Sequence, residues 1–157
     1  MRGDESPSEM IALAYGMEMG LGVFYRQMIE RTDDAEMQAL FAKLADIEQH
    51  HKKRLFDLLT EVDPPDNDIE AYEAELQPTS LEGGFQLDAF VKQNESFLRA
   101  VPDVLDLAMM LETQALDLYL RFAGKSTDNR TRDILFTIAD EEKAHLQSLG
   151  RLLEDKI

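Results

Sequence analysis

The chain has 157 residues, enough for one domain with a substantial buried core. It contains no cysteine, which excludes disulfides, zinc ribbons, iron–sulfur clusters and rubredoxin-type iron sites. Sixteen basic and 32 acidic residues give a formal net charge of −16, which repels nucleic acid and anionic lipid. The sequence shows neither the apolar run of a signal peptide nor a membrane-spanning segment. We therefore expect a cytoplasmic protein with no nucleic-acid or membrane partner.

The first predicted helix begins at a capping-box pattern near the amino terminus. Ser6 stands as N-cap, Pro7 at the first helical position and Glu9 where its side chain reaches back to the cap. The apolar periodicity that follows predicts a helix over residues 7–31.

A second helix is expected after a short turn. Asp33 followed by Glu36 repeats the spacing of a cap signal. The helix should run from residue 34 to about residue 60 and end before a pair of prolines. Residues 7–60 thus form one helical hairpin.

The segment 61–100 is too long for a tight turn and holds three prolines and two glycines. We interpret it as a crossover with short helices at 69–76 and 87–98. Two more helices, at 101–122 and 128–154, form a second hairpin. The chain is therefore predicted to be one all-α domain, a four-helix bundle of two hairpins joined by a long crossover, which is the ferritin-like arrangement.

Three potential metal ligands occur twice at a constant offset of 94 residues. The two sets are Glu18, Glu48 and His51, and Glu112, Glu142 and His145. Each set pairs a lone glutamate on one helix with a Glu-x-x-His motif on the next.

Periodicity places each ligand within an apolar stripe. On the second helix one face holds Met37, Phe41, Leu44, Glu48, His51, Leu55 and Leu58, and the other three helices follow the same pattern. Glu18 and Glu48 each lie 15 residues from position 33, so both stand about 22 Å from the turn. We expect the four glutamates and two histidines to meet at one level of the core.

Four buried carboxylates would repel one another unless cations neutralised them. Residues three apart on a helix are neighbours, so each Glu-x-x-His motif presents a bridging carboxylate and a terminal imidazole to one ion. Oxygen and nitrogen donors suit iron or manganese better than structural zinc. The pattern predicts two metal ions, with two bridging and two terminal carboxylates, and no haem. Tyr25 and Tyr119, also 94 residues apart, are either core residues or hydrogen-bond partners of the ligands.

These ligand helices resemble those of the rubrerythrin-like proteins of the ferritin-like superfamily. The resemblance rests on Glu18 to Tyr25 and Glu112 to Tyr119, together with the two Glu-x-x-His motifs, and it spans most of the chain. It implies that the six repeated residues bind two iron ions. It also implies a homodimer that reduces peroxide or dioxygen in oxidative-stress defence.

The resemblance is incomplete at two points. Classical rubrerythrins carry a cysteine-ligated rubredoxin domain, so a chain without cysteine needs a separate redox protein as electron donor. Their third helix has a further glutamate where this chain has Ala115, and the remaining six-ligand set is closer to that of bacterioferritin. We expect an oxidoreductase. Three alternatives remain: a ferroxidase or iron-handling protein, a metal-binding bundle without turnover, and a di-manganese catalase-like enzyme.

Overall fold

Four long helices dominate the computed structural model, which describes residues 6–64, 68–75, 87–93 and 100–157. They are α1 (Pro7–Arg31), α2 (Ala35–Val62), α5 (Val101–Lys125) and α6 (Asn129–Lys156). Two short helices, α3 (Ile69–Glu75) and α4 (Leu87–Gln93), belong to the connection between α2 and α5. The predicted all-α ferritin-like bundle is confirmed.

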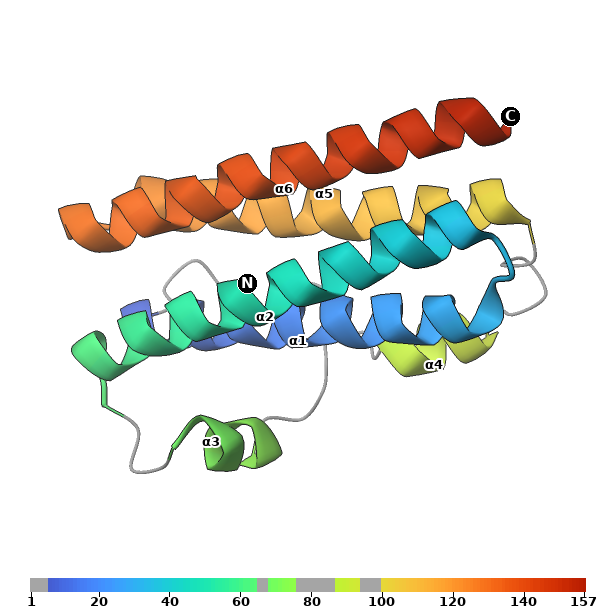
Figure 1. Ribbon diagram of the computed structural model, residues 1–157. Coiled ribbons are helices and arrows are strands. Elements are labelled where there is room, and N and C mark those ends of the chain that lie inside the picture. The colour runs from blue at the N-terminus through green and yellow to red at the C-terminus, as the bar shows by residue number, and fades with distance from the viewer. Residues whose placement is uncertain (1–5, 65–67, 76–86, 94–99) are drawn as a thin grey trace.

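The four long helices form two antiparallel hairpins packed side by side (Figure 1). α1 packs along α2 and α5 packs along α6, and the hairpins meet through α1 against α5 and α2 against α6. α4 lies against α1 (Figure 1). The long connection thus leaves one end of the bundle and returns at the other, as the crossover interpretation requires.

The helix starts follow from local capping. Ser6 and Glu9 form the predicted capping box, in which each side chain accepts a hydrogen bond from the other residue's backbone N–H. The second cap is Asp34, not Asp33 as the spacing indicated, because the Asp34 carboxylate accepts from the N–H groups of Glu36 and Met37. At the far end of the chain, Lys156 of α6 donates to Asp34 at 2.7 Å, which ties the two hairpins together.

The ends of the elements differ from the predictions by a few residues. α2 continues to Val62, beyond its predicted end near residue 60. α5 continues through Gly124 to Lys125, so the connection between α5 and α6 begins later in the sequence than predicted. The last predicted residue of α3, residue 76, and the predicted continuation of α4 over residues 94–98 lie outside the described residues.

The core is the space where the four apolar stripes meet. Every member of the predicted α2 stripe is buried, and so are its counterparts on the other three long helices. The largest side chains with less than 2 % exposure include Tyr25, Phe41, Tyr119 and Phe122. These apolar layers stand above and below the level of the repeated glutamates, and so separate that level from solvent at the two ends of the bundle.

A polar contact fastens α3 to the outer side of the first hairpin. The ammonium of Lys52, a residue only 4 % exposed, and the Tyr15 hydroxyl both donate to the Glu73 carboxylate. Tyr72 packs edge-on against Tyr15, with ring centroids 5.3 Å apart. No helix among the described residues is long and apolar enough to cross a membrane.

Candidate metal centre

The six repeated residues converge at mid-height of the bundle. Their donor atoms form two overlapping groups, each with every ligand atom within 4.8 Å of the others. The first group is Glu18, Glu48, His51 and Glu142, and the second is Glu48, Glu112, Glu142 and His145. His145 is 3 % exposed and the other five are fully buried. Residues far apart in the sequence thus share one enclosed polar cluster.

Two of the glutamates lie between the two histidines. Glu48 directs Oε2 toward His51 Nδ1 at 3.1 Å and Oε1 toward His145 Nδ1 at 3.5 Å. Glu142 directs Oε1 toward His51 Nδ1 at 3.1 Å and Oε2 toward His145 Nδ1 at 3.0 Å. The imidazole rings are stacked, with centroids 5.7 Å apart. Each of these carboxylates therefore serves both halves of the cluster, which is the arrangement of a bridging ligand.

The other two glutamates each serve one half. Glu18 Oε2 lies 3.2 Å from His51 Nδ1, and Glu112 Oε2 lies 3.3 Å from His145 Nδ1. The second oxygen of each accepts a hydrogen bond from a tyrosine of the opposite hairpin, Tyr119 to Glu18 and Tyr25 to Glu112. Both tyrosines thus contact the cluster as well as filling the core. They leave one oxygen of each carboxylate directed toward its histidine.

The two histidines differ at their outer nitrogens. His51 Nε2 lies 2.7 Å from the Glu141 carboxylate, to which Arg54 Nη1 donates at 2.9 and 3.0 Å. His145 Nε2 is buried and has no hydrogen-bond partner among the described residues. Sequence reasoning missed Glu141, because the residue 94 positions earlier is Ile47 and the repeat does not include it. The signal that could have found Glu141 is its position in the sequence, directly before Glu142, which is one of the six residues of the cluster.

The electrostatics of the carboxylates are those of a site that needs positive charge. Burial, followed by the neighbouring carboxylates, raises the pKa of Glu48 and Glu112 well above the ordinary glutamic acid value. The same two causes raise the pKa of Tyr25 and Tyr119, which keeps both hydroxyls protonated as donors. In the absence of cations the cluster therefore has to hold protons.

The imidazoles respond to the same crowding. Burial opposes their charging, but the adjacent carboxylates outweigh it, so that the pKa of His51 lies well above its usual range. For His145 the contacts with Glu112 and Glu142 raise the pKa to about 9. Both rings thus supply positive charge to the cluster when no cation does.

The donor set passes a direct test for fit to two cations. Both carboxylate oxygens of Glu48 and of Glu142 are buried and form no well-directed hydrogen bond with a described residue, although each lies 3.0–3.5 Å from an imidazole nitrogen. Buried oxygens without donors are costly, since a lone unsatisfied polar group costs about 1–3 kcal/mol. Ligation of two cations would satisfy all four. Four carboxylates and two imidazoles without sulfur match hard or borderline metals such as iron and manganese.

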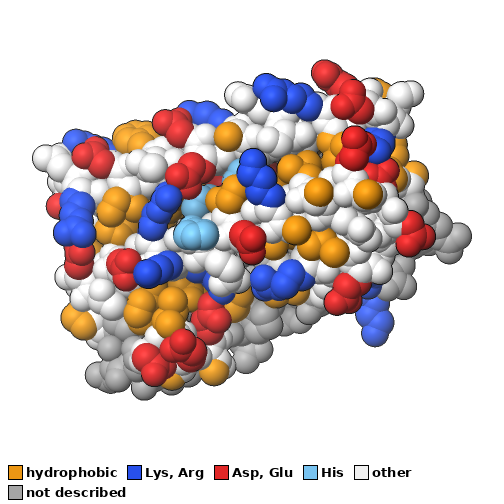
Figure 2. Space-filling model, viewed as in Figure 1, with side chains coloured by type: hydrophobic (Ala, Val, Ile, Leu, Met, Phe, Trp, Pro, Cys, Tyr) orange, Lys and Arg blue, Asp and Glu red, His pale blue; other side chains and the backbone are white. Residues whose placement is uncertain are grey.

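A groove between α2 and α6 leads to one side of the cluster. It has a volume of about 330 Å³, and its lining includes His145 together with Lys43, His50 and Arg54. On this face histidine side chains are visible among interspersed acidic and basic side chains (Figure 2). His50, one residue off the ligand face, lies outside the cluster, with its Nδ1 2.8 Å from the backbone oxygen of Asp46. The groove gives small molecules an approach to His145.

Comparison with known proteins agrees with this geometry. The fold is similar to that of a hypothetical protein from Pyrococcus furiosus, with a TM-score of 0.71 and 22% identity over 98% of this chain and 91% of that chain. A search of curated proteins finds no match. The family model for rubrerythrin matches residues 9–153, which include all six residues of the cluster. The chain belongs to the rubrerythrin family.

Proposed function

We propose that this protein is a di-iron oxidoreductase that reduces hydrogen peroxide or dioxygen with electrons from a separate redox protein. The observation that carries the proposal is the position of Glu48 and Glu142, each with one oxygen directed at either histidine inside a cluster whose members are at most 3 % exposed. Membership of the rubrerythrin family supports iron as the metal. Manganese is the alternative that the same donors would accept.

Each residue has a distinct part in holding the metals. Glu48 and Glu142 would bind both ions. Glu18 with His51 would complete one position, and the remaining pair would complete the other. When bound, two ferrous ions supply the two electrons that convert hydrogen peroxide to two molecules of water, with two protons taken up.

The surroundings of the cluster favour a small oxidant over a bulky substrate. All six residues are at most 3 % exposed, and the groove beside His145 has a volume of only about 330 Å³. Tyr25 and Tyr119 hold the terminal carboxylates through their hydroxyl protons, so that each keeps one oxygen free for a metal. None of the 157 residues is a cysteine, so the electrons have to come from a redox centre outside this sequence.

The proposal is tested by mixing anaerobically reconstituted ferrous protein with hydrogen peroxide, and separately with dioxygen, in a stopped-flow spectrometer. We expect rapid oxidation with one peroxide consumed for every two ferrous ions. The oxidant that reacts faster is assigned as the substrate. Oxidation no faster than that of free ferrous iron would contradict an enzymatic role.

Uptake of iron separates this function from storage. An oxidoreductase of this kind should bind two ions per chain and run as a homodimer in gel filtration. Continued uptake beyond two ions by a very large oligomer would instead indicate an iron-handling protein.

A further inference from the structure

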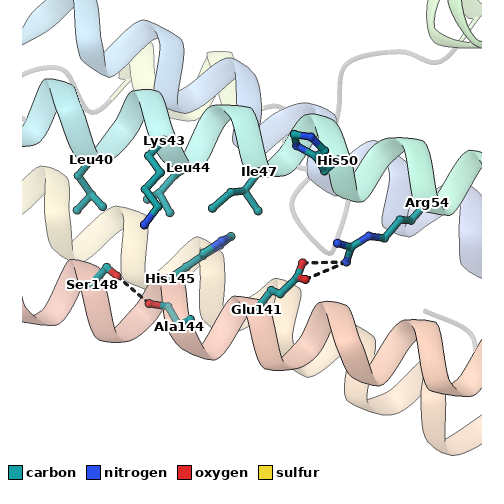
Figure 3. A pocket seen from close by; sticks show the side chains of 10 residues that line it. All are labelled: Leu40, Lys43, Leu44, Ile47, His50, Arg54, Glu141, Ala144, His145 and Ser148. Carbon is teal, nitrogen blue, oxygen red and sulfur yellow. Dashed lines mark hydrogen bonds and ion pairs between the residues drawn. The ribbon is translucent and has the colours of Figure 1, made fainter.

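His51 is the inner end of a hydrogen-bonded chain of three side chains, which continues through Glu141 to Arg54 at the surface. His51 Nε2 lies 2.7 Å from Glu141 Oε2. Arg54 Nη1 donates to both oxygens of that carboxylate (Figure 3). When a metal ion replaces the Nδ1 proton, Glu141 can accept the remaining Nε2 proton, and the Nδ1 lone pair then faces Glu18, Glu48 and Glu142. The ring is thus held in the orientation and tautomer that a metal ligand needs.

His145 has no carboxylate among the described residues that accepts a hydrogen bond from its outer nitrogen, as Glu141 does for His51. The 94-residue offset that relates the ligands relates Glu141 to Ile47 and Arg54 to Ser148. The His145 ring extends from α6 toward Ile47, and the Ser148 hydroxyl donates to the backbone oxygen of Ala144 (Figure 3). His145 Nε2 therefore stays without a partner among the described residues.

We propose that Glu141 is a positioning residue for His51, and that its absence beside His145 makes the two metal positions unequal. The position at His51 holds its ion more tightly, and the position at His145 is the exchangeable one. This inference rests on the proposed two-metal site. It adds an order of loading and release that the repeated ligand pattern does not contain.

The inequality has a physical cause in the outer hydrogen bond. A carboxylate that accepts the outer N–H of a ligating histidine increases the basicity of the other nitrogen and restrains the ring, and loss of such a partner weakens metal affinity about 10–100-fold. Arg54 keeps Glu141 in place through its guanidinium. Ile47 offers His145 neither an acceptor nor a charge.

Exposure acts in the same direction. His51 is fully buried beneath Glu141, whereas His145 lines the groove between α2 and α6. An ion at His145 is therefore nearer to solvent and to competing ligands. Tight binding and slow exchange should coincide at His51.

The test is a titration of the metal-free protein with Co²⁺, followed by its visible absorbance against a competing chelator. The wild-type protein should bind two ions in steps that differ about 10-fold or more in dissociation constant. Glu141→Gln should weaken the tighter step about 10–100-fold and leave the other nearly unchanged. Glu141→Asp, which keeps the carboxylate, should restore part of the difference.

Asp140→Asn is the matched control. It removes the same charge from the same turn of α6, but Asp140 is exposed and pairs with Lys143 at the surface. If it weakened the tighter step as much as Glu141→Gln does, general electrostatics would explain the effect and the inference would be wrong. Two equal steps in the wild-type protein would also overturn it.

Nitrogen NMR of the zinc-loaded, ¹⁵N-histidine-labelled protein assigns the effect to a ring. Glu141→Gln should move the outer N–H signal of one ligand histidine only, and Ile47→Glu should move the other and strengthen the weaker step. If both variants moved the same signal, or Glu141→Gln moved neither, the assignment would fail. Absence of any bound metal in the wild-type protein would instead defeat the two-metal site itself.

Discussion

The two hairpins present the same candidate metal ligands in different surroundings. In α1–α2 the imidazole His51 is held from outside by Glu141, whereas in α5–α6 the imidazole His145 has no such partner. The glutamates and tyrosines of the cluster, by contrast, are matched across the halves. Inside the cluster every donor has to face a shared centre, so the two halves are constrained alike. Residues that contact only the outer side of one histidine have no such constraint, and there the two hairpins differ, as Glu141 and Ile47 show.

The outer side of the hairpins shows the same divergence on a larger scale. The first hairpin buries Lys52 and Tyr15, which together bind Glu73 of the crossover helix α3. The residues 94 positions later are Leu146 and Met109, so the second hairpin lacks the groups for such a contact. The 94-residue repeat therefore includes the candidate metal ligands but not Lys52 and Tyr15, which hold the crossover helix α3.

The largest effect should come from removing a shared ligand. Glu48→Gln should weaken binding of both metals, by more than about 100-fold, because Glu48 faces both histidines. Glu18→Gln should weaken mainly the position at His51, because Glu18 contacts that histidine alone. The measurement is the number of metal ions bound per chain after reconstitution. Equal losses from the two variants would break the distinction between bridging and terminal glutamates.

A second effect is a loss of stability of the metal-free protein at high pH. Contacts with Glu112 and Glu142 overcome burial and raise the pKa of His145 to about 9, against about 6.5 in an unfolded chain. The stabilising proton is fully present below pH 6.5 and lost as the pH rises to about 9. The free energy of unfolding should fall by about 3 kcal/mol over this window.

The metal-loaded protein provides the control for this pH effect. Metal ions replace the proton, so its stability should change little between pH 6.5 and 9.

In the metal-free protein the pKa of His51 is raised further than that of His145, so an NMR titration should show His145 losing its proton first. Glu142, whose pKa is lowered despite its burial, titrates below this window. Loss of the His51 proton first would contradict the difference between the halves.

The smallest effect concerns a glycine that only the first hairpin contains. Gly20 lies inside α1, where the second hairpin has Gln114, and a Cβ added there would meet no atom of the described residues within 4 Å. Gly20→Ala should raise the free energy of unfolding by about 0.5–1 kcal/mol, because alanine loses less conformational freedom in a helix. Thermal unfolding would measure the gain. A loss of stability together with a change in oligomeric state would show that a second copy of the chain covers this face.

Much of the fold was predictable because the start and the buried face of a helix are marked by residues close together in the sequence. Alternating apolar spacing identified the buried faces, and the capping box placed the start of α1 at the correct residue. The choice between Asp33 and Asp34 as the second cap was not predictable, because both are acidic and only the backbone conformation at Asp34 allows its carboxylate to reach the helix.

The convergence of the cluster was predictable for a related reason. Equal distances from the turn place Glu18 and Glu48 at one height, whatever the details of packing. The partners of His51 were not, because Glu141 and Arg54 belong to different hairpins and their contact depends on how α2 and α6 are rotated about their axes. Tyrosine contacts across the cluster depend on the same rotation.

We infer that two metal ions share Glu48 and Glu142 at the centre of the bundle. Anomalous diffraction at the iron absorption edge, from crystals of the reconstituted protein, tests it most directly. We expect two peaks between those carboxylates, one beside His51 and one beside His145. A single peak, or iron bound only at the surface of the protein, would contradict it.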